Sequence, residues 1–180
     1  MRSQVFVAVG VCAVVGLGGQ LAYAQQVNKE QVAGIRNLAR LETTIACAGA
    51  ITAASVPEIK KMGFASIINL RLADEPGAEV EKEAAAAKDA GIRYFHIPFN
   101  GSSPDPGAAG RFLDVITSPG AQPAFVHCAA GNRAATMWLI KRLAVDHWDV
   151  DRATAEAIAL GQTSADLRRF AIDYGQSHRR

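Results

Sequence analysis

A short apolar run that ends in a cysteine constrains the fold of this chain more than any other feature. Residues 124–128 (AFVHC) suit a buried strand, and residues 134–140 (AATMWLI) suit a packed helix. The chain must pass from strand to helix within residues 129–133, and Gly131 permits a tight turn there because it has no side chain. Junctions of this kind are typical of α/β folds.

The same junction predicts a site for an anion. Unpaired backbone N–H groups converge at a helix N-terminus, and the helix dipole favours negative charge there. An anion would suit that position, and so would the thiolate of Cys128, which is the nucleophilic form of a cysteine. Arg133 adds a guanidinium nearby. The alternative is a buried cysteine that acts only as a small apolar residue. The combination of His127, Cys128, Gly131 and Arg133 favours the anion-binding or nucleophilic site.

Strands and helices alternate along the rest of the chain. We expect strands over residues 43–48, 65–70, 93–97 and 121–127, and helices over residues 56–62, 79–90, 107–116, 133–145, 151–160 and 164–174. This alternation predicts an α/β fold in a single domain over residues 43–180, with a mostly parallel central sheet flanked by helices and residues 149–176 as C-terminal helices. Residues 25–42 are polar with periodic apolar positions, and we expect an N-terminal helix or an extended arm there. Sites in such sheets lie beyond the carboxyl ends of strands, where Cys128 falls.

The first residues have the pattern of a secretory signal peptide. A basic start, an apolar run over residues 5–17 and the motif Ala22-Tyr23-Ala24 predict removal of residues 1–24. The run is shorter than the roughly 20 residues of a membrane span, so no stable membrane anchor is expected after cleavage. These features predict a periplasmic or secreted protein. The 19 Lys and Arg residues nearly balance the 17 Asp and Glu residues, which does not favour a nucleic-acid partner.

Two cysteines, Cys47 and Cys128, remain after cleavage in a compartment that permits disulfides. A structural bridge between them would prevent Cys128 from acting as a standing nucleophile. We expect Cys128 to be a free or redox-switchable thiol and Cys47 to be buried. His96, His147 and His178 lack the spacing with other ligand types that indicates a metal, so neither a metal nor a cofactor is expected.

Three segments resemble a known superfamily in their order and spacing. They are residues 64–72 (FASIINLRL), 90–99 (AGIRYFHIPF) and 126–133 (VHCAAGNR), and they are similar to cysteine-dependent phosphatases. In particular they resemble the bacterial group related to dual-specificity and tyrosine phosphatases that is described as the beta-lactamase hydrolase-like protein phosphatase domain, or DUF442. The resemblance covers roughly residues 47–143. It implies a phosphatase-like α/β fold and hydrolysis of a phosphate monoester, on a protein or a small molecule, through a phosphocysteine intermediate.

The resemblance also implies roles for single residues. Cys128 matches the nucleophile, and Arg133 matches the residue that clamps the equatorial phosphate oxygens. His127 matches the position that supports the loop through hydrogen bonds, although a satisfied core histidine explains it equally. The phosphate cradle corresponds to Ala129, Ala130, Gly131 and Asn132.

The chain departs from the superfamily pattern at three places. Four residues separate Cys128 from Arg133, one fewer than in most of these phosphatases, as in the loop of rhodaneses. Ala134 stands where a Ser or Thr commonly helps the thiolate to leave. The loop that usually carries the general acid, an aspartate, has Asn100-Gly101 here. The nearest carboxylate is Asp105, which is either the acid or the N-cap of the next helix.

Three classes of function remain open on these residues. The first is a phosphatase-like hydrolase in which Cys128 attacks phosphorus. The second is a rhodanese-type sulfurtransferase in which Cys128 carries a sulfane sulfur and needs no acid. The third is a non-catalytic module that binds an anion or senses redox state through Cys128 and Cys47. Arg71, Asp74 and Glu75 follow the second strand, where they line the cleft mouth or belong to a solvated loop.

Overall fold

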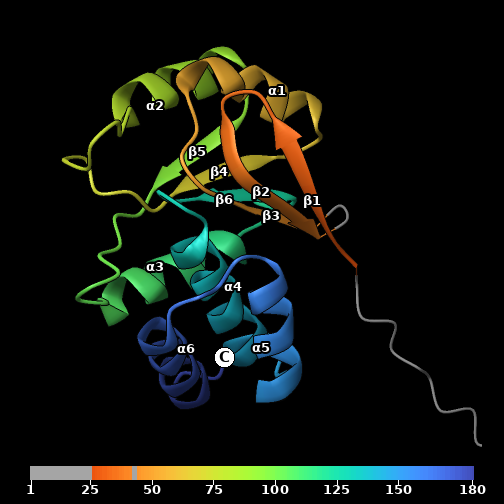
Figure 1. Ribbon diagram of the computed structural model, residues 1–180, viewed down its shortest axis with the longest axis vertical. Coiled ribbons are helices and arrows are strands. Elements are labelled where there is room, and N and C mark those ends of the chain that lie inside the picture. Colours follow the sequence, from red (N-terminus) through yellow and green to blue (C-terminus); the bar gives the residue numbers. More distant parts are fainter. Residues whose placement is uncertain (1–25, 42–43) are drawn as a thin grey trace, which may run out of the picture.

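The computed structural model describes residues 26–41 and 44–180, so the predicted signal peptide lies outside the described residues. It contains a six-stranded sheet between two layers of helices (Figure 1). The strands are β1 (Val27–Val32), β2 (Ile35–Leu41), β3 (Ile45–Ala48), β4 (Ser66–Asn69), β5 (Arg93–His96) and β6 (Ala124–His127). Their order is β1-β2-β3-β6-β4-β5, in which β3, β6, β4 and β5 are parallel neighbours and the two N-terminal strands are antiparallel. The predicted α/β fold with a mostly parallel sheet is confirmed.

The N-terminal segment, for which we expected a helix or an extended arm, forms a β-hairpin. Its apolar residues do recur at helical spacing, but Gly34 adopts a φ of +76° and turns the chain between the two strands. Val32 then pairs with Ile35 across the turn, and Leu38 and Leu41 are buried against the sheet. β2 pairs with β3 and covers an edge that would otherwise be unpaired. The segment is extended, as one of the two expectations had it, but it belongs to the sheet and is not a separate arm.

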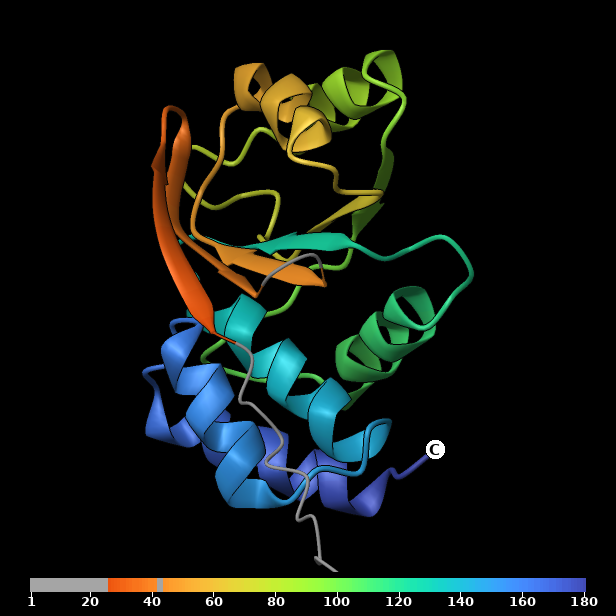
Figure 2. The same cartoon turned by 90° about the vertical axis from the view of Figure 1, so that its right-hand side faces the viewer.

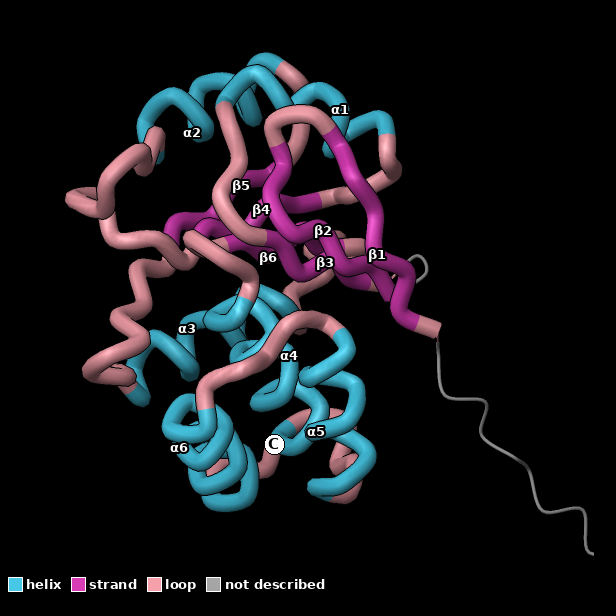
Figure 3. The backbone as a smooth tube through the Cα atoms, in the orientation of Figure 1, coloured by secondary structure: helices cyan, strands magenta, loops and turns pink. Residues whose placement is uncertain are grey.

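The helices divide between the two faces of the sheet. α1 (Val56–Lys61) and α2 (Val80–Asp89) cover one face. The other face is covered by α3 (Pro106–Ile116), α4 (Asn132–Ala144), α5 (Val150–Ala159) and α6 (Ala165–Ser177), as the side view in Figure 2 and the tube in Figure 3 show. Each of the helices expected from residue 56 onward is present, with its ends shifted by a few residues. In the described part of the chain, no helix has the length and apolarity needed to cross a membrane.

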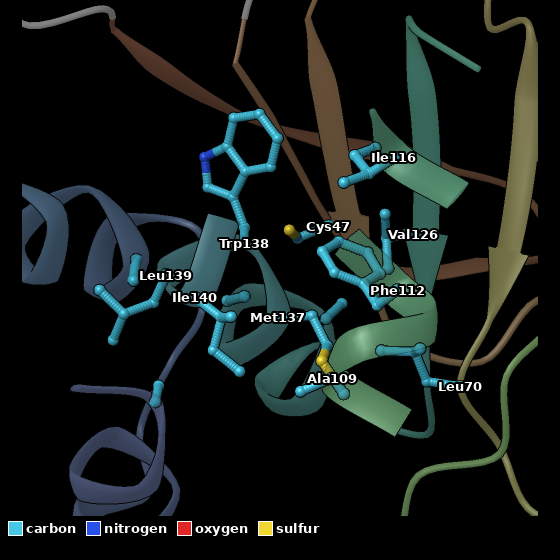
Figure 4. Close-up of a cluster of buried hydrophobic side chains, with 14 of the residues drawn as sticks. Cys47, Leu70, Ala109, Phe112, Ile116, Val126, Met137, Trp138, Leu139 and Ile140 are labelled. Atoms are coloured by element: carbon cyan, nitrogen blue, oxygen red, sulfur yellow. The ribbon is translucent and has the colours of Figure 1, made fainter. Parts of the chain in front are cut away.

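α4 is the central helix of its layer, because it packs between the sheet and the three other helices on that face. Every residue from Ala134 to Ala144 is buried, and most of these residues are apolar; Lys141 and Arg142 are buried with carboxylate partners. Figure 4 shows Trp138 and Met137 on α4 close to Phe112 on α3 and to Cys47 on β3. This dense packing holds the N-terminus of α4 in a fixed position at the end of β6.

Candidate active site

The loop between β6 and α4 has its carbonyl groups turned outward. The oxygen of Ala129 accepts a hydrogen bond of 3.1 Å from a backbone N–H in the segment after β3, and the oxygen of Ala130 accepts one of 3.1 Å from Asn37 Nδ2 on β2. In a trans peptide the N–H points away from the C=O of the same unit. The N–H groups of Ala130 and Gly131 therefore point to the inside of the loop, toward Cys128.

The sulfur of Cys128 lies at the centre of this loop. The Gly131 N–H donates to Cys128 Sγ at 3.2 Å. Gly131 is the N-cap residue of α4, has a φ of +102° and provides no side-chain cap, so the first N–H groups of the helix remain available to an anion. The structure thus brings the thiol, the inward N–H groups and a helix N-terminus to one point, with a geometry that suits a thiolate or a bound oxyanion.

Arg133, the second residue of α4, reaches back over this loop. Its Nη1 and Nη2 atoms bind the two carboxylate oxygens of Glu75 at 2.6 and 2.8 Å. Nη1 also donates to the backbone oxygens of Leu70 and Phe99, at 3.2 and 2.8 Å. These bonds do not use the Nε–H or the second proton of Nη2, which together form the other bidentate side of the guanidinium.

Opposite charges surround this guanidinium. Burial by itself would lower the pKa of Arg133, but the Glu75 carboxylate and the Cys128 sulfur outweigh burial and raise that pKa. Burial would likewise raise the pKa of Glu75, but Arg133, the Leu72 N–H and Arg71 lower it to about 2. Glu75 is therefore a carboxylate at neutral pH, and Arg133 is a fixed cation beside the cysteine.

The role of Glu75 was not predictable from its local sequence, because a solvated loop explained this residue equally well. Arg71 is 3 % exposed and anchors the loop that carries Glu75: its Nε binds Glu75 Oε2 at 3.2 Å, and its other nitrogens bind the oxygens of Pro76 and Gly77 at 2.7 Å. The feature of the sequence that could have identified Glu75 was its position after a strand. Glu75 follows the carboxyl end of β4, the direct neighbour of β6.

Asn132 contributes its backbone to the loop and turns its side chain away. Asn132 Oδ1 accepts hydrogen bonds from the N–H groups of Thr163 and Ser164, at 2.8 and 3.2 Å. These residues join α5 to α6, and Ser164 caps α6 by accepting from the Leu167 N–H at 3.3 Å. The side chain of Asn132 therefore ties the loop to the C-terminal helices.

Asp105 occupies the N-cap position of α3. Its two oxygens accept from the N–H groups of Gly107 and Ala108 at 2.8 and 3.0 Å, and one oxygen lies 3.5 Å from Arg111. The loop after β5 contacts Arg133 through Phe99 and Gly101, and its residues 97–104 are all uncharged. A Cβ placed on Gly101 would lie 3.5 Å from Cγ and Cδ of Arg133. The geometry thus supports the capping alternative for Asp105.

His127 points to the sheet face opposite Cys128, because side chains alternate along a strand. It is fully buried beside Glu83 of α2, with Nε2 at 3.2 Å from Oε2, outside ordinary hydrogen-bond geometry. Glu83 instead accepts hydrogen bonds from Asn69 Nδ2 at 2.8 Å and Tyr94 Oη at 2.9 Å. His127 is therefore a core residue, but its ring nitrogens have no hydrogen-bond partner, so it makes neither the expected hydrogen bonds to the loop nor those of a satisfied core histidine.

Cys47 and Cys128 are both free and buried. Cys47 is paired with Val126 between β3 and β6, so Cys47 and Cys128 lie on one sheet face, two positions apart along neighbouring strands. Burial, with the negative charges of Cys128 and Glu156, raises the pKa of the Cys47 thiol well above its ordinary value. Cys47 is therefore a protonated, buried thiol. Among the described residues, no group of three or more His, Cys, Asp or Glu side chains is arranged to hold a metal.

A central parallel strand that leads to a cysteine, a loop of inward N–H groups and an arginine on the following helix are the features of a phosphatase-like α/β domain. A family model described as "Beta-lactamase hydrolase-like protein, phosphatase-like domain" matches residues 37–145, and the chain belongs to this family. A beta-lactamase hydrolase-like protein of Agrobacterium fabrum is 33% identical over 105 residues, which are 56% of this chain. The matched residues span only 24% of the length of that relative.

Solved structures share the fold at lower identity. A DUF442 protein titled a putative phosphatase, from Shewanella putrefaciens, aligns with a TM-score of 0.67 and 17% identity over 82% of this chain and 96% of its own. The core catalytic domain of the PP-IP phosphatase SIW14 from S. cerevisiae aligns with a TM-score of 0.63 and 18% identity over 80% of this chain and 88% of its own. A variant of P. aeruginosa TpbA in complex with pTyr aligns with a TM-score of 0.62 and 19% identity over 87% of this chain and 91% of its own.

Proposed function

We propose that this chain is a cysteine-dependent phosphatase that hydrolyses phosphate monoesters through a phosphocysteine intermediate. The observation that carries the proposal is the arrangement around Cys128 Sγ. A backbone N–H donates to the sulfur at 3.2 Å, and the free side of the Arg133 guanidinium remains available because Glu75 occupies the other side. A dianionic phosphate complements both sets of donors. The family and the fold of the solved relatives support the proposal.

The proposed reaction has two steps. The Cys128 thiolate attacks phosphorus and the ester oxygen leaves, while the loop N–H groups and the Nε and Nη2 side of Arg133 bind the equatorial oxygens. Water then attacks phosphorus in the phosphocysteine, which releases inorganic phosphate and restores the thiolate. Glu75 acts as a positioning residue, because its bidentate bond fixes the plane of the Arg133 guanidinium.

The proposal favours substrates with a good leaving group. Gly101, which lies beside the aliphatic part of the Arg133 side chain, belongs to an uncharged loop, and the carboxylate of Asp105 accepts hydrogen bonds from the first turn of α3. Without an acid to protonate the leaving oxygen, an aryl phosphate reacts faster than an alkyl phosphate because a phenolate is the more stable anion. The binding of pTyr by the TpbA variant supports phosphotyrosine as the substrate type.

A paired turnover assay tests this function. The reduced protein without residues 1–24 and its Cys128→Ser variant are given p-nitrophenyl phosphate in one arm, and thiosulfate with cyanide in the other. We expect release of phosphate that falls by at least about 10³-fold in the variant, since loss of a nucleophile removes the covalent pathway. Thiocyanate as the only product would overturn the proposal in favour of a sulfurtransferase, and no turnover in either arm would indicate a binding or redox-sensing module.

We also propose that the protein acts in the periplasm or outside the cell. The support is the pattern of residues 1–24, with an apolar run followed by Ala22-Tyr23-Ala24. Expression of the full chain in a bacterial host, followed by N-terminal sequencing of the periplasmic fraction, is expected to give Gln25 as the first residue. Full-length protein that remains in the cytoplasm would contradict this localisation.

A further inference from the structure

Three polar side chains form a closed set of hydrogen bonds between the sheet and α2, on the face opposite α4 (Figure 1). They belong to Asn69 at the end of β4, Tyr94 on β5 and Glu83 on α2, and we call them the Asn69 ring. Asn69 Nδ2 donates to Glu83 Oε2 at 2.8 Å and to Tyr94 Oη at 2.9 Å. Tyr94 Oη donates to the same Glu83 oxygen at 2.9 Å. Asn69 and Glu83 are fully buried, and Tyr94 is half-buried.

The Asn69 ring is connected to the loop that carries Glu75. Asn69 Oδ1 accepts a hydrogen bond of 2.8 Å from the backbone N–H of Arg71. Because a backbone N–H can only donate, the amide oxygen of Asn69 must face Arg71 and its NH2 group must face the ring. Asn69 thus uses its oxygen and both of its N–H bonds. The ring holds the amide in one orientation, and the amide holds the first residues of the loop.

Arg71 is held from a second strand as well. The Nε2 atom of His96, at the end of β5, lies 2.8 Å from the backbone oxygen of Arg71, and it donates there because a carbonyl oxygen can only accept. The ends of two neighbouring strands therefore fix the N–H and the C=O of this one residue. The Arg71 guanidinium then binds Glu75 and two backbone oxygens of the same loop. Arg71 thus transmits the position of the strand ends to Glu75.

The Asn69 ring adds order to this loop at a cost in stability. Glu83 Oε1 and both ring nitrogens of His127, which lies beside Glu83, are buried without a hydrogen-bond partner. Buried polar atoms without partners disfavour folding, and apolar side chains of similar volume would fill this space without that cost. Stability of the core therefore does not require a polar ring here. The contact from Asn69 to the Arg71 N–H gives the ring a different role, which is to fix a loop.

We propose that the Asn69 ring positions the phosphate-clamping arginine from the opposite face of the sheet. It holds the backbone of Arg71, and the Arg71 guanidinium holds Glu75 in the orientation that fixes Arg133. This inference rests on the proposed function, in which the free side of Arg133 binds the phosphate. Asn69 is a positioning residue and not a catalytic one, because it acts through Arg71 and lies on the sheet face away from Cys128.

A double-mutant cycle tests this path. Asn69→Ala leaves the Arg71 N–H without its acceptor, and we expect kcat/KM for p-nitrophenyl phosphate to fall about tenfold, as for Glu75→Gln. The double variant Asn69→Ala/Glu75→Gln should lie within about twofold of either single variant, because both substitutions release the same guanidinium. A fall of about a hundredfold in the double variant would show independent effects and would overturn the proposal.

The matched control is Ser66→Ala at the other end of β4. Ser66 is also fully buried, and its Oγ donates to the backbone oxygen of Ala121 at 2.5 Å. Ser66→Ala therefore removes a buried hydrogen bond of the same strand and should lower stability, but it should leave kcat/KM of the folded protein unchanged. Equal effects of Ser66→Ala and Asn69→Ala on kcat/KM would overturn the proposal, because general loosening of β4 would explain both.

A milder substitution covers the case in which Asn69→Ala fails to fold. Tyr94→Phe removes one acceptor of Asn69 and one donor to Glu83, and keeps the ring of the tyrosine. We expect it to lower kcat/KM about two- to threefold in the wild type and not at all in the Glu75→Gln background. A loss of the same size in both backgrounds would overturn the proposal.

The proposed function fails separately, if the wild type does not hydrolyse p-nitrophenyl phosphate in a Cys128-dependent way. The positioning is then measured on Glu75 itself, by NMR titration of its side-chain carboxyl carbon. Burial raises the pKa of Glu75, but Arg133, the Leu72 N–H and Arg71 lower it to about 2. Asn69→Ala should make Glu75 protonate at a higher pH, because its cations are no longer held in place, and Ser66→Ala should not. An unchanged titration of Glu75 in Asn69→Ala would overturn the inference.

Discussion

The two ends of helix α4 each carry an arginine that is paired with carboxylates, yet the two arginines differ in what they leave free. Near the C-terminus, Arg142 binds Glu156 through Nε and Nη2, at 2.7 and 3.2 Å, and binds Asp146 through Nη1 at 2.9 Å. Its guanidinium also lies 4.5 and 4.0 Å from the ring centres of Trp138 and Trp148. Every nitrogen of this side chain has an anionic partner, so Arg142 holds α4 and α5 together.

At the N-terminus, Arg133 is nearly as buried, with 12% of its side chain exposed against 9% for Arg142. Burial therefore does not distinguish the two. The helix dipole stabilises a cation at the C-terminus and disfavours one at the N-terminus, so Arg133 needs anions more than Arg142 does. Glu75 takes only one side of its guanidinium. The comparison teaches that unpaired donors, and not burial, mark the arginine that is suited to bind a ligand.

The largest expected effect on stability is at the C-terminal arginine. Arg142→Ala should lower the free energy of unfolding by about 3–5 kcal/mol, because Glu156 would remain buried without its cation. Chemical denaturation measures this change. The kcat/KM of correctly folded protein for p-nitrophenyl phosphate should stay close to the wild-type value. A large loss of activity without a loss of stability would contradict the division between the two ends of α4.

At the other end, Arg133→Lys should lower kcat/KM for p-nitrophenyl phosphate by about 10²–10³-fold, because a lysine keeps the charge but cannot bind two phosphate oxygens at once. Steady-state kinetics and the inhibition constant of inorganic phosphate measure the effect. Unchanged affinity for phosphate in this variant would show that the free side of Arg133 does not face the ligand.

Glu75→Gln sharpens the comparison, because it keeps the shape of the partner and removes its charge. We expect kcat/KM to fall about tenfold as Arg133 loses its fixed orientation. The pKa of Glu75 is lowered to about 2. The charged pair therefore stabilises the fold fully above about pH 4.3, and this contribution is lost as the pH falls toward 2. Melting temperatures of the two proteins should differ at pH 7 and converge at low pH. A difference that does not depend on pH would exclude the ion pair as its cause.

The smallest effect is expected at Asp105, where two substitutions separate the cap from the acid. Asp105→Ala should lower the free energy of unfolding by about 1 kcal/mol, whereas Asp105→Asn keeps an oxygen for the cap and should leave stability nearly unchanged. Asp105→Asn should also leave turnover of aryl and alkyl phosphates at the wild-type value. A selective loss with alkyl phosphates would make Asp105 the general acid.

Short-range features were predictable from the sequence. The strand, turn and helix around Cys128 are contiguous, and their apolar pattern and Gly131 predicted the observed junction from local rules alone. Asp105 followed by Pro106 likewise indicated a helix start, and the structure has the cap there. These elements need only their own residues and a buried face, so they could be found without knowledge of the rest of the fold.

Long-range partners were not predictable in the same way. Arg133 and Glu75 are 58 residues apart, and nothing in the loop after β4 distinguishes Glu75 from a solvated carboxylate until β4 and β6 lie side by side. The sequence left a helix and an extended arm open for residues 25–42, because the apolar spacing fits both structures, and only pairing with the edge of β3 decides for strands.

The sequence by itself therefore determined the order of strands and helices from residue 45 onward, the position of Cys128 at a strand end and the helix start behind it, because these depend on local propensity and hydrophobic pattern. Only the tertiary structure decided which carboxylate holds Arg133, which strand binds the oxygen of Ala130 and which side of the sheet receives His127. Those features depend on the order of strands in the sheet, which brings residues far apart in the chain within hydrogen-bond distance.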